Sequence, residues 1–432
     1  MRIPPLTTGP PLSDPAPPHD PVADADADPA SDAPAPLRAG YDAVLLAGFG
    51  GPEGPDDVMP FLRNVTRGRG IPEERLVEVS HHYSALGGAS PINAQNRDLR
   101  DALSVELAGR GRAVPVLWGN RNWAPYLADV IRDAHRDGLI RLLGLATSAY
   151  SCYSSCRQYR EDFGMALASS DLVGEVRIDK VAPYHHRPGF IAPFVDGTAA
   201  ALRTASDAGI QIADLEIVFT THSIPLVMAD ASGSADLGDH GQGGAYVAQH
   251  LSVARAVIDG VTARSGAAPG WQLAYQSRSG PPSVPWLEPD INEVITDLAA
   301  AGRAGVIVVP IGFVSDHVEV VWDLDNEAAE TAASHHLFFA RVGTPGTDPR
   351  FVSALADLVE ERLDDRSSAD PNSTDPVTGI RRRPDFCAAG CCANSRVTRP
   401  TTAAVDSAAD WSGVPVDPAK LAASGIRGAV RG

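Results

Sequence analysis

Short runs of β-branched and aliphatic residues alternate with amphipathic segments from residue 41 to residue 364. The runs predict strands because glycine or polar residues bound them, and apolar residues at helical spacing predict helices in between. The expected strands are 43–48, 114–118, 140–147, 175–181, 215–221, 272–276 and 306–311, and the expected helices are 55–65, 92–108, 124–136, 154–168, 189–206, 244–264, 290–301, 317–333 and 349–364. This alternation is typical of an α/β fold built from βαβ units, with parallel sheets that helices cover on both faces.

The predicted elements fall into two similar halves that meet near residues 180 to 210. We therefore expect an N-terminal domain at 41–190 and a C-terminal domain at 191–365. Residues 1–40 are rich in proline, alanine and aspartate and hold almost no large apolar side chain, which predicts a disordered tail. Residues 366–432 begin as a polar linker and continue as a cysteine-containing extension with few apolar residues to fold it.

The overall composition is that of an ordinary globular protein, with 44% hydrophobic and 21% charged residues in a chain of 432. The net charge of −18 disfavours a nucleic-acid partner, because phosphate binding depends on clustered lysine and arginine. No segment approaches the roughly 18 consecutive apolar residues of a membrane-spanning helix, and the N-terminus lacks the apolar core of a signal peptide. These features predict a cytoplasmic protein.

The last predicted strand is followed directly by a row of carboxylates. Glu319, Asp323 and Glu327 recur every four residues, so they share one face of the predicted helix. Ser315 or Asp316 would cap its first turn. Because like charges at this spacing repel each other, a fold that keeps the row would use it for a cation or for proton transfer. A solvated helix face is the alternative interpretation.

Three further turns follow the ends of expected strands, at 49–52, 148–152 and 222–225. In open parallel sheets, ligands bind beyond the carboxyl ends of the strands, so we expect these turns and the acidic helix to converge. His222 in the last turn could ligate a divalent metal or move a proton near neutral pH. A neutral histidine satisfied by a backbone partner is the alternative.

A glycine-rich turn at 87–91 predicts the start of another helix, with Ser90 as its cap and Pro91 at its first position. Such helix starts bind anions well. The turn matches neither the P-loop nor the dinucleotide fingerprint, so nucleotide binding is rejected. Arg67 and Arg69 lie in a short loop nearby in sequence and could pair with the carboxylates of a ligand.

The five cysteines are unevenly grouped, which favours a metal or redox role over a secreted disulfide framework. Cys152 and Cys156 form one group, and Cys387, Cys391 and Cys392 lie within six residues. Soft thiolates select zinc or iron–sulfur centres, and composition leaves the two comparable. A fourth ligand would come from the middle of the chain and would attach the tail to the main domain.

Together these segments resemble ferrochelatase, in the same order along residues 41 to 392. The matching segments are LLAGFGGPE at 45–53, HHYSALGGASPI at 81–92, TTHSIP at 220–225 and GFVSDHVEVVWDLDNEA at 312–328. The segment CAAGCC at 387–392 is similar to the actinobacterial branch that inserts iron into coproporphyrin III. The resemblance implies two Rossmann-like domains that enclose a porphyrin cleft. It also implies insertion of Fe²⁺, as a substrate, into coproporphyrin III in haem biosynthesis, with protoporphyrin IX as a second candidate substrate.

The resemblance also implies roles for the acidic row. His222 would lie on one face of the macrocycle, for metal binding or proton abstraction, and Glu319 on the opposite face. Asp323 and Glu327 would continue a hydrophilic path for metal delivery or proton exit. Clustered carboxylates are expected to raise one another's proton affinity, which suits proton acceptance. In the family this helix is locally widened to π geometry.

Substrate contacts carry over from the resemblance less directly. Ser90 and Tyr83 match positions that contact propionates, and Arg67 or Arg69 is in the corresponding loop. His82 stands where some relatives have arginine. Phe49 stands where some bacterial relatives have a tyrosine that can ligate haem iron. The expected substrate-binding residues are Phe49, Arg67, Arg69, His82, Tyr83, Ser90, Ser151 and Tyr159.

By the same resemblance, Cys156, Cys387, Cys391 and Cys392 match the ligands of a 2Fe-2S cluster, and Cys152 is left over. The expected partners are coproporphyrin III and ferrous iron, and we expect a monomer with transient contacts to neighbouring haem-pathway enzymes. Two alternatives remain: a haem or iron–sulfur sensor on a chelatase scaffold, and a cobalt chelatase acting on sirohydrochlorin. The intact acidic row argues against the first and the cysteine segment against the second.

Overall fold

A computed structural model describes residues 40–68, 70–233, 240–280, 283–364, 390–393 and 398–402, together with positions 411, 417 and 420. The predicted tail at 1–40, apart from Gly40, lies outside the described residues. Arg69, Cys387 and most of the predicted extension also lie outside them.

The described chain forms two four-stranded parallel sheets with the same strand order. The first sheet has the order β2-β1-β3-β4, and its strands are β1 (Ala43–Gly48), β2 (Val116–Asn120), β3 (Arg141–Ala146) and β4 (Arg177–Lys180). The second has the order β6-β5-β7-β8, with β5 (Leu215–His222), β6 (Gly270–Gln276), β7 (Gly305–Val309) and β8 (Phe338–Arg341). The predicted α/β class is confirmed, and β8 is the one of these strands that the sequence pattern did not predict.

Each predicted helix is present, with ends shifted by a few residues, and two unpredicted ones, α2 and α7, join them. The helices are α1 (Pro55–Val65), α2 (Glu73–Ala85), α3 (Ile92–Gly109), α4 (Leu127–Arg136), α5 (Gln158–Ser169), α6 (Pro188–Asp207), α7 (Leu226–Asp230), α8 (Gly244–Ser265), α9 (Ile291–Ala300), α10 (Val318–Val320), α11 (Ala329–Ser334) and α12 (Pro349–Leu363). Residues Tyr153–Arg157 and Val321–Ala328 form the π-helices η1 and η4, and Ile212–Asp214 form the 3₁₀-helix η2.

Two predicted helix caps are wrong. The residue before α10 is His317, and no side chain caps this helix. The Ser315 hydroxyl instead bonds to Asn96, and the Asp316 carboxylate pairs with Arg341. Likewise α3 begins at Ile92 without a side-chain cap, so Ser90 does not cap it. Ser315 and Asp316 instead make tertiary contacts, which the local sequence cannot reveal.

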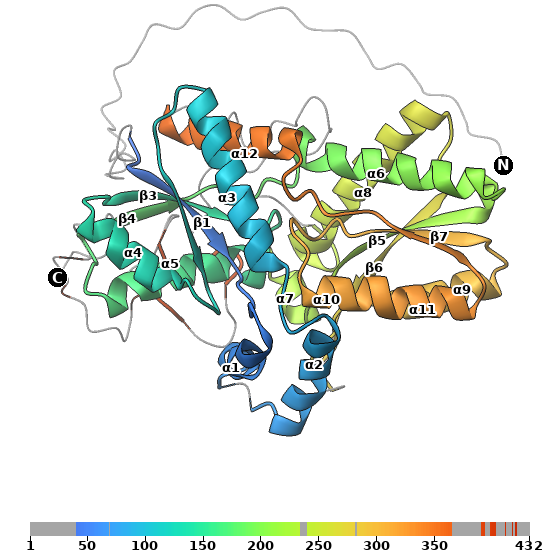
Figure 1. The fold of residues 1–432 in the computed structure, drawn as a ribbon, viewed down its shortest axis with the longest axis horizontal. Coiled ribbons are helices and arrows are strands. Elements are labelled where there is room, and N and C mark those ends of the chain that lie inside the picture. The colour runs from blue at the N-terminus through green and yellow to red at the C-terminus, as the bar shows by residue number, and fades with distance from the viewer. Residues whose placement is uncertain are drawn as a thin grey trace, which may run out of the picture. The chain divides into compact units, whose positions relative to one another are not determined.

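Helices cover both faces of the second sheet, with α6 and α8 on one face and α9, α10 and α11 on the other (Figure 1). Alternate residues of β5 therefore enter different cores: Ile217 and Phe219 pack toward α8, and Val218 packs toward α9 and η4. Burial on both faces explains why these strands are apolar throughout. The first of these cores is continuous with Leu46 of β1, so the two halves share apolar packing.

The predicted domain boundary between residues 190 and 191 lies near the start of α6. Helix α12, from the end of the second half, packs on both α6 and α3. None of the helices in the described ranges combines the length and the apolar content needed to cross a membrane.

Candidate active site

The strand order of the second sheet creates a switch point between β5 and β7. From β5 the chain moves to β6 on one side, and from β7 it moves to β8 on the other. Loops leaving the two central strands diverge there, which is where open parallel sheets bind ligands. His222 ends β5, and the turn after β7 leads to Glu319. The Gly312 amide donates to the Thr220 carbonyl at 3.1 Å and holds the two strand ends together.

His222 and Glu319 are neighbours at this switch point. His222 Nε2 lies 3.7 Å from Glu319 Oε2, and His317 Nδ1 lies 3.9 Å from the same oxygen. The Nδ1 of His222 donates to the Ser223 carbonyl at 2.5 Å, which leaves Nε2 directed at the carboxylate. The geometry therefore presents an imidazole nitrogen and a carboxylate oxygen to the same small volume.

This separation corrects the expectation that His222 and Glu319 lie on opposite faces of a macrocycle. A flat ring between two atoms needs a van der Waals contact of about 3.5 Å on each side, or about 7 Å in all. The observed 3.7 Å leaves no room for it. In this structure the two groups lie side by side, without the gap that a ring between them would need.

The three carboxylates of the row do not share one electrostatic environment. The Glu319 side chain is 53% exposed, and desolvation disfavours its charged form, but the neighbouring His222 and His317 outweigh this effect and lower the pKa of Glu319 to about 2. The pKa of His222 is raised, because the Glu319 carboxylate outweighs the effect of burial. Burial, with Glu319 and Glu327 nearby, raises the pKa of Asp323 to about 7. The expected rise in proton affinity therefore holds for Asp323 and is wrong for Glu319.

The expected π geometry is confirmed at residues 321–328, which include Asp323. Its carboxylate accepts a hydrogen bond from the Ser277 hydroxyl and one of 3.4 Å from Gln276 Nε2. Both donors lie at the carboxyl end of β6, and Ser277 has a φ of 60°, a left-handed conformation that few non-glycine residues adopt. Asp323 is thus held at the same edge of the sheet as His222.

A cluster of aromatic rings follows the end of β1. The ring of Phe49 lies 6.5 Å from that of Phe61, which lies 6.0 Å from both Tyr83 and Trp123. Phe49 is 39% exposed, so it presents an apolar face to solvent. Burial and the charge of Glu319 raise the pKa of Tyr83, so the buried end of this cluster lies within electrostatic range of the carboxylate.

The remaining predicted substrate residues are more dispersed. Tyr159 is buried beneath the Arg121 guanidinium, 4.8 Å from its ring. The Ser151 amide donates to Gln249 Oε1 at 2.9 Å, and Gln249 returns a bond of 3.0 Å to the Ser151 hydroxyl. Ser90 is buried, and Arg67 is exposed in the turn after α1. The structure therefore does not bring all of the predicted substrate residues to one surface.

The sequence of residues 41–363 matches the family described as Ferrochelatase. The chain belongs to the ferrochelatase family. It is 53% identical over 364 residues to the Coproporphyrin III ferrochelatase of Leifsonia xyli subsp. xyli (strain CTCB07), covering 83% of this chain and 92% of the relative. It is 52% identical over 375 residues to that of Streptomyces griseus subsp. griseus, covering 85% and 97%. SirB from Bacillus subtilis with Fe³⁺, at 12% identity, covers 76% of this chain and 97% of its own, and its TM-score of 0.41 is too low to bear on function.

In this member of the ferrochelatase family, Cys156, Cys391 and Cys392 are buried in contact with one another. The Sγ atoms of Cys391 and Cys392 are 3.7 Å apart, and the Gly233 amide lies 3.2 Å from the sulfur of Cys392. Cys152 is separate, with its sulfur near the hydroxyls of Ser154 and Ser155. Cys387 lies outside the described residues. Among those that are described, no three or more His, Cys, Asp or Glu side chains are arranged as a preformed metal site.

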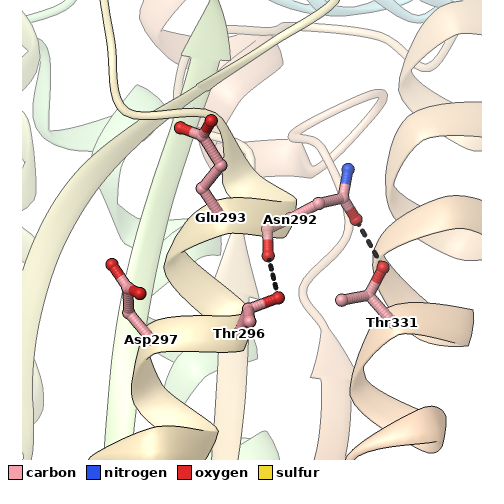
Figure 2. Close-up of a pocket in the computed structure, with 5 residues that line it drawn as sticks. All are labelled: Asn292, Glu293, Thr296, Asp297 and Thr331. Carbon is pink, nitrogen blue, oxygen red and sulfur yellow. Dashed lines mark hydrogen bonds between the residues drawn. The ribbon is translucent and has the colours of Figure 1, made fainter.

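A shallow pocket lies beside the end of the π-helix (Figure 2). It is lined by Asn292, Glu293, Thr296 and Asp297 of α9 and by Thr331 of α11. The Thr331 hydroxyl contacts both Asn292 Oδ1 at 2.8 Å and the Glu327 carbonyl at 2.9 Å. None of the predicted site residues lines this pocket. The contacts of Thr331 join α9 to the end of the acidic row.

Sequence reasoning missed several neighbours of the predicted site. His317 lies two residues before Glu319, so a search for imidazoles flanking the acidic row would have found it. Ser277 follows the end of β6, and the rule on strand ends points to it equally well. Arg121 carries no comparable signal, because its packing on Tyr159 depends on the fold.

Proposed function

We propose that this chain inserts Fe²⁺ into coproporphyrin III and releases coprohaem for haem biosynthesis. The observation that carries the proposal is the convergence of His222, Glu319 and Asp323 at the switch point of the second sheet. The two relatives described above, both named Coproporphyrin III ferrochelatase, support the choice of substrate. Protoporphyrin IX is the second candidate substrate.

The proposed reaction exchanges two pyrrole N–H protons of the macrocycle for one ferrous ion, so the site must hold a cation and accept protons. Glu319, with its low pKa, remains a carboxylate and attracts the ion. His222 offers Nε2 to the metal or to a pyrrole proton. Asp323, with a pKa of about 7, can take up a proton and pass it on near neutral pH. Glu327, farther along the row, would receive hydrated iron.

The exposed ring of Phe49, supported from beneath by Phe61 and Tyr83, would hold one face of the macrocycle by stacking and burial. Arg67 and Arg69 are proposed to pair with propionates, since guanidinium groups suit carboxylates. Phe49 has no atom that can ligate iron. The remaining proposed substrate contacts are His82, Ser90, Ser151 and Tyr159.

A 2Fe-2S cluster held by Cys156, Cys387, Cys391 and Cys392 is part of the proposal. Two thiolates about 2.3 Å from one tetrahedral metal lie roughly 3.8 Å apart, which agrees with the 3.7 Å between Cys391 and Cys392. Burial and the nearby Gly233 amide also suit thiolate sulfur. When bound, such a cluster supplies a one-electron redox centre and ties the C-terminal extension to η1.

Three general properties complete the proposal. The division into domains at 41–190 and 191–365 agrees with the two sheets. We further propose a monomer that makes transient contacts with neighbouring enzymes of the haem pathway. We also propose that the protein works in the cytoplasm.

Steady-state insertion assays with coproporphyrin III, protoporphyrin IX and sirohydrochlorin, each offered Fe²⁺ and Co²⁺, test the function. The proposal predicts the highest kcat/KM for Fe²⁺ with coproporphyrin III. Preference for Co²⁺ with sirohydrochlorin would make the protein a cobalt chelatase. No turnover with any pair would favour a haem or iron–sulfur sensor.

A further inference from the structure

Trp322 lies within the acidic row and contacts one of its carboxylates. Its indole N–H donates to Glu327 Oε1 at 2.8 Å, although the two residues are five positions apart. Residues at that spacing point in different directions on an α-helix. In a π-helix, backbone hydrogen bonds join positions i and i+5, so such residues lie one above the other. Both belong to η4, and the π geometry is what brings the indole to the carboxylate.

A face of the Trp322 indole contacts α2. The ring of His82 stacks on the indole with centroids 4.3 Å apart and planes inclined by 8°. His82 therefore joins the helix that carries the aromatic residue Tyr83 to the helix that carries the acidic row. Stacked aromatic pairs of this kind contribute beyond the area they bury.

Glu327 is thus fixed at two points. The Thr331 hydroxyl lies 2.9 Å from the Glu327 backbone carbonyl and 2.8 Å from Asn292 Oδ1 of α9 (Figure 2), and its one hydrogen is shared between these two acceptors. Its side chain is held through Oε1 by Trp322. An indole N–H can only donate, so it fixes one carboxylate oxygen and leaves the other lone pairs for a water of a hydrated cation.

We propose that Trp322 is a positioning residue for iron uptake, which orients the Glu327 carboxylate toward incoming hydrated Fe²⁺ and is itself held in place by His82. The inference rests on the proposed function, because it assigns Glu327 to iron delivery. It adds that the orientation of this carboxylate depends on one indole N–H.

Trp322→Phe tests the proposal by removing the N–H while keeping an aromatic ring against His82. One hydrogen bond to an exposed carboxylate should change the KM for Fe²⁺ by roughly 3- to 10-fold, with a smaller change in kcat. Trp118→Phe is the matched control, because the Trp118 indole N–H is buried without a hydrogen-bond partner among the described residues. The control should keep the wild-type KM. An unchanged KM for Fe²⁺ in Trp322→Phe would overturn the proposal.

A double-mutant cycle separates positioning from a general structural effect. In a Glu327→Ala background, Trp322→Phe should add no further loss, because the indole acts only through that carboxylate. Additive losses would contradict this. His82→Phe, which retains a ring on Trp322, should restore most of the iron affinity lost in His82→Ala. Equal losses in the two would refute the role of the stack.

Anaerobic titration of Fe²⁺ alone, without porphyrin, provides a readout that does not depend on turnover. Trp322→Phe should bind Fe²⁺ roughly 3- to 10-fold more weakly than wild type. Absence of iron insertion by the wild-type enzyme would defeat the proposed function. Equal Fe²⁺ affinity of the two proteins would defeat only the positioning role.

Discussion

Asp323 differs from its neighbours in the acidic row because of residues that come from other segments. Glu319 faces two imidazoles and stays ionised, whereas Asp323 is partly buried between Glu319 and the end of β6. Spacing along the helix predicted that these side chains would share a face. It could not predict which of them would titrate near neutral pH, since His222 and Ser277 are distant in sequence.

Replacing Asp323 should remove a neutral-pH ionisation from the rate profile. A carboxylate accepts a proton only when ionised, so with a pKa of about 7 the wild-type kcat/KM should rise as pH increases through that value. Asp323→Asn should lower turnover by roughly 100-fold or more and abolish this rise with pH. The measurement is kcat/KM from about pH 5.5 to about pH 8.5. If the variant still showed the rise of kcat/KM with pH near 7, another group would be its source.

His250 should make the folded state sensitive to acid. Burial lowers its pKa to about 3, so the unfolded chain binds its proton near pH 6.5 and the folded chain does not. Above about pH 6.5 His250 is neutral in both states and does not affect the free energy of unfolding. As pH falls from there toward 3, only the unfolded chain binds the proton, so the free energy of unfolding decreases by up to about 1.4 kcal/mol per pH unit. His250→Phe keeps the stack on Tyr150, 3.7 Å away, and removes the titration. Urea unfolding at several pH values across this range should show that the free energy of unfolding depends less steeply on pH in His250→Phe than in wild type. An unchanged pH dependence would exclude His250 as its source.

At the scale of elements, the sequence predicted most strands and helices but missed β8 and α2 for definable reasons. The strand β8 has four half-buried residues at a sheet edge, and its pairing with β7 is not visible locally. In α2 only Leu76 and Tyr83 are buried, so its apolar face is too sparse to stand out. The π-helices are equally invisible in the pattern, and the expectation of one came from the resemblance alone.

The docking of the C-terminal extension on α5 should be sensitive to a single methyl group. A Cβ at Gly164 would lie 2.5 Å from the Pro400 carbonyl oxygen, and backbone cannot yield as a flexible side chain can. Gly164→Ala should therefore lower the free energy of unfolding by about 1–3 kcal/mol and expose 398–402 to proteases. Gly109→Ala is the matched helical control with open space around it, and it should be neutral or slightly stabilising. Equal behaviour of the two variants would show that the docking is loose.

The cysteine cluster gives a second prediction for this region. Protein purified without oxygen should contain about two irons and two sulfides per chain. Cys156→Ser should lose them, whereas Cys152→Ser should retain them because its sulfur bonds to neighbouring serines. Iron and acid-labile sulfide analysis checks both. Zinc in place of iron, or loss of iron from Cys152→Ser, would contradict the assignment.

At the scale of the whole described molecule, α8 links the carboxyl ends of the two sheets. The Tyr246 hydroxyl donates to the His222 carbonyl at 2.9 Å, while Gln249 bonds to Ser151 after β3. One helix thus fixes His222 relative to the first sheet. The rule on strand ends predicted that these turns would meet. It did not predict the bonds that α8 makes to both turns, because polar side chains in a helix ordinarily indicate a solvated face.

The central claim is that His222 and Glu319 act together, from one side of the macrocycle, to insert iron. The most direct measurement is the rate of Fe²⁺ insertion into coproporphyrin III by wild type, His222→Ala and Glu319→Gln, with circular dichroism confirming that each is folded. The pair is 3.7 Å apart and both groups serve the same step, so each variant should lose at least roughly 100-fold in kcat/KM. The double variant should lose little more than either single variant. Normal rates in both single variants would contradict this mechanism.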